Sequence, residues 1–344
     1  MKQLSGRRFL FPVCGIILLL LFPTEAGAGV RSGLQLCGNV LIPSLFPVSV
    51  LAGCLLRMQP DRAAERLTGG WMQTLFGLPG ACSVPVSLGL LGGFPLGAQL
   101  TATLYREGGI SRAAAVRLSM ICNFAGPAFL FGIVGTALGG QPYGAVLFLI
   151  QFVSAVLSGM LLFDPQDSTE ENNHNFRQPA LSFWDALPAS ISESAAGMLR
   201  LTGAIVFFSA MTACLSVLLP LHALPQIGKS ILLGILEVSS GIDSLRGIPH
   251  LYSFPTAAFL VGWGGLCVHL QAAGALHVVG LPVKPYLISK LLQGLVSSVI
   301  SCLLLPTFTG SASIWFWFCL VATGVLFFFA VFKKIHWKTS SPVL

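Results

Sequence analysis

Apolar stretches long enough to cross a lipid bilayer follow one another along most of this chain. A transmembrane helix needs about 20 mainly apolar residues. Candidate spans lie at 34–57, 113–138, 142–163, 193–219, 254–279, 284–305 and 312–332, with a shorter one at 9–22. The pattern predicts an all-α integral membrane protein with about eight transmembrane helices, so the lipid bilayer is its first expected partner.

Four apolar segments are interrupted by glycine, proline or polar residues, and they form two similar pairs about 140 residues apart. The first pair contains LLGGFPLG (Leu90–Gly97) and CNFAGP (Cys122–Pro127). The second pair contains GILEVSSG (Gly234–Gly241) and GWGGLCVHLQ (Gly262–Gln271). Breaks at matching places in two halves are typical of transporters whose broken helices surround a site near the middle of the membrane.

The placement of lysine and arginine indicates how the interrupted segments 82–104 and 225–246 meet the membrane. If both are re-entrant hairpins, 16 of the 19 basic residues, Lys290 among them, lie on the cytoplasmic side with both termini. If both cross the membrane, only 12 lie there. The hairpin arrangement is therefore favoured, and it gives the two halves opposite orientations, which makes an inverted repeat.

A polar, acidic linker at 164–190 divides the chain into halves of similar size. The expected organisation is an N-terminal anchor helix at 1–30, a first repeat at 31–163, this cytoplasmic linker, and a second repeat at 191–305. A C-terminal helix with a basic tail follows at 306–344.

The N-terminus allows two interpretations. Basic residues precede a short apolar core, and Ala26-Gly27-Ala28 matches the small-residue cleavage site of a signal peptide. An uncleaved first helix is favoured, because the rest of the chain is itself inserted in the membrane.

Composition supports the membrane assignment and excludes several classes of protein. Hydrophobic residues make up 54% of the chain and charged residues only 9%, too few charges for the surface of a soluble protein. The net charge of +7 is spread over the ends of segments without interleaved aromatic residues, so no nucleic-acid partner is expected. The nine cysteines are scattered singly without a CxxC motif, which predicts buried small side chains rather than a metal site.

Catalytic motifs are also missing from the sequence. It contains no Walker-type phosphate loop, no GxSxG elbow and no HExxH motif. We therefore expect neither an enzyme nor a bound cofactor.

Glu237 is the strongest single candidate for function. A carboxylate inside an apolar segment is costly unless it is partnered, neutralised or in contact with water, and such residues mark ligand and ion sites in membrane proteins. Ser239 and Ser240 follow it, so hydroxyl groups and unwound backbone can converge on a ligand. The alternative is a structural role, as an ion pair with Lys229 or Arg200 or as a protonated carboxyl group.

Three polar side chains near the other breaks complete the candidate site. The amide of Asn123 can bind a solute or bridge two helices. His269 can relay protons or donate one hydrogen bond between helices, and Gln271 lies close to it in the sequence. The backbone expected at the breaks is formed by Gly92, Gly93, Pro95, Gly97, Gly126, Pro127, Gly241, Gly264 and Gly265.

These motifs resemble a known family. The runs GGFPLGA (Gly92–Ala98), CNFAGP (Cys122–Pro127), GGLCVHLQ (Gly264–Gln271), PSLFP (Pro43–Pro47) and LEVSSG (Leu236–Gly241) are similar to those of the sporulation integral membrane proteins of the YlbJ type. That family carries the nucleoside recognition or Gate domain, similar to a module of concentrative nucleoside transporters and of ferrous-iron transport protein B. The resemblance covers roughly residues 30–305 and implies two Gate-like repeats and a role in endospore formation. Cys267 stands where a serine is expected, and Lys290 where arginine is common.

The resulting hypothesis is a multi-pass protein of the bacterial cell membrane with a transporter-like core. It would bind or move a small polar solute or ion while the spore cortex and envelope form. The alternative is a membrane scaffold that does not transport and that is needed for spore envelope assembly. Further partners would be other sporulation membrane proteins or a second copy of the chain.

Overall fold

The computed structural model describes residues 5–58, 69–70, 72–162, 180–219 and 223–308, and these residues form helices without any strand. The predicted all-α fold is confirmed for this part of the chain. The first half contains α1 (Ser5–Leu21), α2 (Pro23–Leu36), η1 (Cys37–Leu41), α3 (Ile42–Arg57), η2 (Gly80–Cys82), α5 (Ser83–Gly92), α6 (Leu96–Arg106), α7 (Arg112–Ile121), α8 (Pro127–Phe129), η3 (Leu130–Val134), α9 (Gly135–Ala137) and α10 (Gln141–Leu161). The second half contains α11 (Phe183–Leu218), α12 (Gln226–Leu236), α13 (Val238–Asp243), α14 (His250–Trp263), α15 (Gly265–Val278) and α16 (Lys284–Phe308).

Five helical stretches among the described residues are long and apolar enough to cross a membrane. They are Pro23–Arg57, Gln141–Leu161, Phe183–Leu218, His250–Val278 and Lys284–Leu305. Shorter apolar helices account for other predicted segments, so the predicted number of about eight spans is not confirmed. The candidate span 312–332 and the tail at 309–344 lie outside the described residues.

Two predicted boundaries differ from the observed helices. The span predicted at 34–57 begins at Pro23, because α2 continues through the π-helical turn η1 into α3. The division after residue 30 therefore falls inside a helix, and so does Ala26-Gly27-Ala28. Residues 183–190 of the predicted linker belong to α11, because Ser182 caps that helix by accepting a hydrogen bond from the backbone N–H of Asp185.

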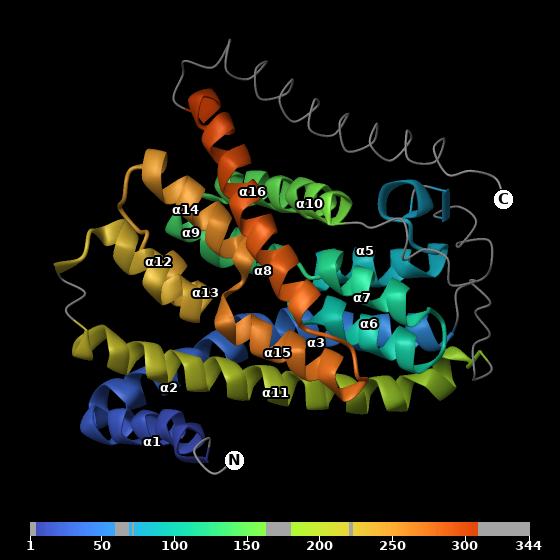
Figure 1. Cartoon of the computed structure of the whole chain (residues 1–344), viewed down its shortest axis with the longest axis horizontal. Helices are drawn as coiled ribbons and strands as arrows, with labels where there is room; N and C mark the ends of the chain where they lie inside the picture. The colour runs from blue at the N-terminus through green and yellow to red at the C-terminus, as the bar shows by residue number, and fades with distance from the viewer. Residues whose placement is uncertain (1–4, 59–68, 71, 163–179, 220–222, 309–344) are drawn as a thin grey trace.

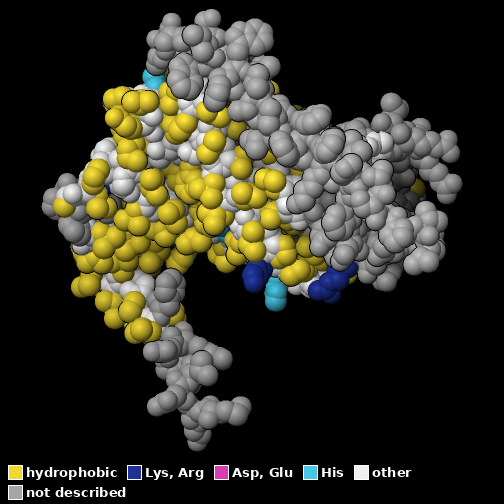
Figure 2. Space-filling model, turned by 45° about the horizontal axis from the view of Figure 1, so that its top comes forward, with side chains coloured by type: hydrophobic (Ala, Val, Ile, Leu, Met, Phe, Trp, Pro, Cys, Tyr) yellow, Lys and Arg dark blue, Asp and Glu magenta, His cyan; other side chains and the backbone are white. Residues whose placement is uncertain are grey.

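The surface of the described residues is largely apolar. Large hydrophobic side chains such as Leu20, Leu199 and Val278 are at least three-quarters exposed. Hydrophobic side chains cover most of the described face in Figure 2, and the basic side chains in view gather at its lower edge. Continuous exposed apolar surface of this kind suits contact with lipid rather than water.

The long helix α11 runs along one side of the molecule, with α2 and α3 packed against it (Figure 1). The helix α16 packs against α14, α10 and α7. Each of the two largest core clusters contains residues from both predicted repeats. The halves are therefore interleaved, and their breaks meet in the interior.

Helices end and restart at all four interruptions. Gly93, with φ 78°, separates α5 from α6, and the segment 122–126 separates α7 from α8. Glu237, in an extended conformation, separates α12 from α13, and the left-handed Gly264 separates α14 from α15. Glycine is the residue that takes positive φ without steric cost.

The hairpins and the breaks of the next spans pack backbone against backbone. A side chain at Gly97 of the first hairpin would overlap the carbonyl oxygen of Cys122. In the second half, a Cβ atom at Gly265 would lie 3.1 Å from the carbonyl oxygen of Gly234 and 3.2 Å from the amide nitrogen of Val238. Each hairpin therefore sits on the break of the following span, which holds both breaks in place.

Candidate functional site

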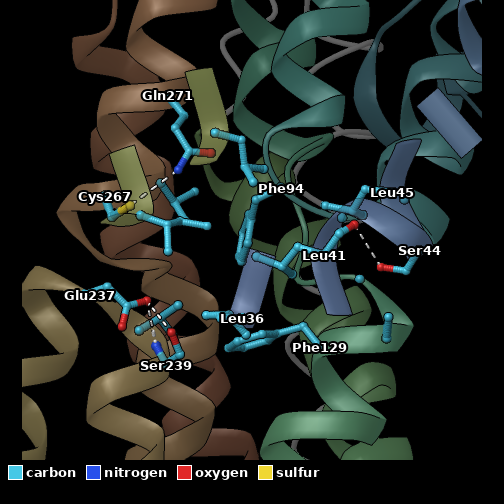
Figure 3. A pocket seen from close by; sticks show the side chains of 18 of the residues that line it. Leu36, Leu41, Ser44, Leu45, Phe94, Phe129, Glu237, Ser239, Cys267 and Gln271 are labelled. Carbon is cyan, nitrogen blue, oxygen red and sulfur yellow. Dashed lines mark hydrogen bonds between the residues drawn. The ribbon is translucent and has the colours of Figure 1, made fainter. Parts of the chain in front are cut away.

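A small pocket of about 70 Å³ lies where the breaks of the two halves meet. Its walls come from α2, η1 and α3, from the tip between α5 and α6, and from α8, α11, α13 and α15. Most of the lining is apolar, but Glu237 and Ser239 lie at one end and Gln271 at the other (Figure 3). A mainly apolar pocket with a few polar groups is the usual form of a small-molecule site.

Glu237 is 4% exposed, and its carboxylate is bonded by the two residues of α13 that follow Val238. One oxygen accepts hydrogen bonds from the backbone N–H and the hydroxyl of Ser239, at 3.0 and 2.5 Å. The other accepts from the backbone N–H and the hydroxyl of Ser240, both at 2.8 Å. Four donors thus satisfy the charge without a basic partner.

The carboxylate occupies the N-cap position of α13. The first N–H groups of a helix lack partners within the helix and carry partial positive charge, so a carboxylate there is stabilised. Among the described residues, no ion pair includes Glu237, so neither Lys229 nor Arg200 is its partner. The local cap accounts for the buried charge, and the side chain still lines the pocket.

Gln271 of α15 faces the other end of the pocket. Its amide Nε2 donates a hydrogen bond to the Sγ atom of Cys267, one turn earlier, at 3.3 Å (Figure 3). Sulfur is a weak acceptor, so this bond holds the amide only lightly.

A second, larger cavity of about 840 Å³ adjoins the pocket. It extends between α3, α6, α11 and α15, and Gln271 and Leu201 line both the cavity and the pocket. Pro95, at the tip of the first hairpin, also lines the cavity. The polar end of the pocket is therefore next to a space large enough for a metabolite.

Charged residues line one end of the large cavity. Glu193 of α11 forms ion pairs with Arg57 at 2.5 Å and with Arg106 at 3.2 Å. Arg200 lines the cavity on the same helix. Just after α6, burial raises the pKa of the Glu107 carboxyl above its ordinary value, and the nearby charges of Arg57 and Arg106 only partly offset this effect. Glu193 was not among the residues predicted from the sequence, although a carboxylate within an apolar helix is a signal for such a cluster.

Asn123 and His269 lie outside the lining of both cavities. Asn123 is 1% exposed, and its side-chain oxygen accepts from the backbone N–H of Ala98 at 3.1 Å. The Nδ1 atom of His269 is 3.2 Å from the Tyr286 hydroxyl, and its ring packs edge-on against Trp263. Both side chains bond to a neighbouring segment at the breaks, and a role of either in binding a solute stays a prediction.

Lys290 lies in the interior, although the charge rule assigned it to the cytoplasmic side. Its side chain is fully buried, and the Nζ atom donates to the carbonyl oxygen of Asn123 and to Oε1 of Gln293. Its burial means that it is not a surface charge, so it should not have been counted as a marker of the membrane side, and the side on which it lies stays a prediction. A lysine within an apolar helix, followed three residues later by glutamine, was the available signal.

Two glutamines extend this buried network. Gln293 donates to the carbonyl oxygen of Gln151, and the Gln151 side chain bonds both the N–H and the carbonyl of Ala125, at 2.7 and 3.1 Å. The unwound segment 122–126 therefore receives its missing hydrogen bonds from α10 and α16.

The predicted site residues thus divide into two groups. The pocket is lined by Glu237, Ser239, Gln271, Gly92, Gly93 and Gly126. Ser240 acts through its bonds to Glu237, whereas Asn123, His269, Pro95, Gly97, Pro127, Gly241, Gly264 and Gly265 lie outside the pocket lining. Within the described part of the chain, no cluster of three histidine, cysteine or acidic residues is placed to hold a metal ion.

The chain is similar to the sporulation integral membrane protein YlbJ of Bacillus subtilis (strain 168). The two are 28% identical over 312 residues, which cover 80% of this chain and 76% of the relative. No family model matches the chain, and no solved structure matches it. This similarity to an integral membrane protein, together with the five long apolar helices among the described residues, supports a location in a membrane.

Proposed function

We propose that this chain is a sporulation membrane protein whose core binds and moves a small polar solute. The similarity to an integral membrane protein of sporulation supports the cellular process. The mode of action rests on one observation: the large cavity and the Glu237 pocket are adjacent and share Gln271 and Leu201 in their walls. The protein would act by binding and passage rather than by catalysis.

The broken helices fit this proposal. Transporters place binding groups where helices unwind near the membrane midplane, because free backbone groups and helix ends are available there. The two hairpins and the two broken spans would then be Gate-like, inverted repeats, with both termini in the cytoplasm. Under the positive-inside rule, the cavity end with Arg57 and Arg106 faces the cytoplasm.

The charge of the lining gives a preference among solutes. The charged side chains that line the large cavity are three arginines and one glutamate, Arg57, Arg106, Arg200 and Glu193. A cavity with excess positive charge raises the local concentration of anions. A polar solute with an anionic group therefore suits the large cavity better than a cation does.

Uptake into vesicles tests the proposal. The purified full chain is reconstituted and exposed to nucleosides, inorganic ions, cell-wall precursors and small organic anions. We expect protein-dependent uptake of at least one solute. The variant Glu237→Gln should lose most of that uptake, because the carboxylate is replaced at the end of the pocket.

Asp243→Asn is the matched control, since Asp243 is a solvent-exposed carboxylate of the same short helix. It should transport like the original chain. If no solute is taken up, or if Glu237→Gln transports normally, the transport proposal fails and the scaffold alternative gains support.

A further inference from the structure

We propose that Phe94 and Gln271 form a movable barrier between the large cavity and the Glu237 pocket, and that a solute passes when it opens. This inference rests on the proposed function and adds the residues that control passage. Phe94 lines the pocket, while the next residue, Pro95, lines the large cavity. Gln271 and Leu201 line both spaces. The hairpin tip, Gln271 and Leu201 are therefore the wall between them.

Volume indicates that the barrier is closed in this structure. Pockets that hold drug-sized molecules measure about 300–1,000 Å³. The large cavity falls in that range at about 840 Å³, whereas the pocket measures about 70 Å³. A metabolite fits the cavity but not the pocket, so the wall must move before the solute reaches Glu237.

The ring of Phe94 rests on the break of the second half. A Cβ atom at Gly264 would lie 3.4 and 3.5 Å from two atoms of this ring. Gly264 has φ 89° and separates α14 from α15, the helix that carries Gln271. The tip of one hairpin therefore touches the hinge of the opposite broken span, and a change at that hinge moves both members of the barrier.

The polar member of the barrier indicates which solutes pass. The Gln271 amide donates to the thiol of Cys267, a weak acceptor. An oxygen of a carboxylate, carbonyl or hydroxyl group accepts such a hydrogen bond better than sulfur does. A solute that presents an oxygen acceptor can thus replace the thiol and free the amide, whereas an apolar molecule cannot.

Cys267 reports the state of the barrier directly. It is 2% exposed and lines the pocket but not the large cavity. A small thiol reagent that enters from the large cavity must pass the barrier to reach its Sγ atom. The measurement uses a full chain in which Cys267 is the single cysteine. Its rate of modification then measures how often the barrier opens, and no transported solute is needed.

The test compares Phe94→Leu and Phe94→Ala with Phe129→Ala. Phe129 also lines the pocket but not the large cavity, so its truncation enlarges the pocket and leaves the wall in place. We expect modification of Cys267 to be faster by several-fold in Phe94→Leu and faster still in Phe94→Ala, with little change in Phe129→Ala. Equal rates in the Phe94 and Phe129 variants would overturn the barrier.

Gln271→Leu separates the barrier from the proposed transport. It should also speed modification, because the hydrogen bond from the Gln271 amide to the Cys267 thiol is lost. If Phe94→Ala does not fold, the milder Phe94→Leu gives the answer. If the chain transports a solute but the rate of Cys267 modification does not depend on residue 94, the barrier alone is refuted. If that rate rises as residue 94 becomes smaller but no solute is taken up, transport alone is refuted.

Discussion

The breaks of the two halves are stabilised by opposite kinds of side chain, a hydrogen-bond donor at one and an acceptor at the other. At the break of the first half, the buried Nζ atom of Lys290, which comes from α16, donates to the carbonyl of Asn123, just beyond the C-terminal end of α7. In the second half, the buried carboxylate of Glu237 accepts from the N–H groups at the start of α13. Each side chain thus matches the partial charge of the helix end that it meets.

The origin of the partners differs between the two breaks. Lys290 links the segment 122–126 to α16 across 167 positions of the sequence, and Gln151 links it to α10 across 26 positions. Glu237 is bonded by Ser239 and Ser240, its near neighbours in sequence, and it faces a pocket. The first break is therefore fixed by the fold, while the second places a carboxylate at the end of a pocket.

Among the changes that test this difference between the breaks, replacing Gly97 by alanine should have the largest effect on stability. The new methyl group would overlap the Cys122 carbonyl, and backbone atoms on both sides leave little room to shift. We expect a loss of stability above about 4 kcal/mol, seen as little folded protein in detergent extracts. Gly274→Ala in α15 is the control, since a methyl group there meets nothing within 4 Å. A stable Gly97→Ala protein would show that the first break is not rigid.

Lys290→Met should come next in size. The change leaves the Asn123 carbonyl and the Gln293 side chain without their donor, at about 1–3 kcal/mol for each unpaired buried group. The apparent Tm in detergent should fall clearly. The same substitution at the exposed Lys284, on the same helix, should leave the Tm nearly unchanged. Equal melting of the two variants would mean that the buried ammonium group contributes nothing to the first break.

Ser240→Ala should have the smallest effect. It removes one of the four hydrogen bonds to Glu237, and a single side-chain hydrogen bond contributes about 1 kcal/mol. We expect a small fall in Tm relative to Ser192→Ala, a change at an exposed serine of α11. A fall in Tm as large as that of Lys290→Met would mean that the two breaks depend equally on their buried polar side chains.

The breaks of the helices were predictable from the sequence, but the directions of the side chains were not. Glycine and proline mark where a helix must stop, so the four interruptions could be located. Once a chain has unwound, helical periodicity no longer says which way the next side chain points. Asn123 and His269 therefore looked equivalent to Glu237, although only Glu237 of the three lines the pocket.

Long-range partners explain the remaining differences. Lys290 looked like a marker of the membrane side because its acceptors, Asn123 and Gln293, come together only in the fold. The start of α11 was missed because Asp185 and Pro188 are typical of a polar linker, whereas the first turns of this helix pack against α3.

The length of α11 makes the position of this helix depend on the thickness of the bilayer. At 1.5 Å per residue, its 36 residues extend about 54 Å, while the hydrocarbon core of a bilayer is about 30 Å thick. The helix must therefore tilt or project beyond the lipid tails. Since residues between Ala189 and Ala204 form a wall of the large cavity, a change in tilt moves that wall against α3 and α6. If α11 meets the mismatch by tilting, the width of the cavity follows the thickness of the membrane in which the protein lies.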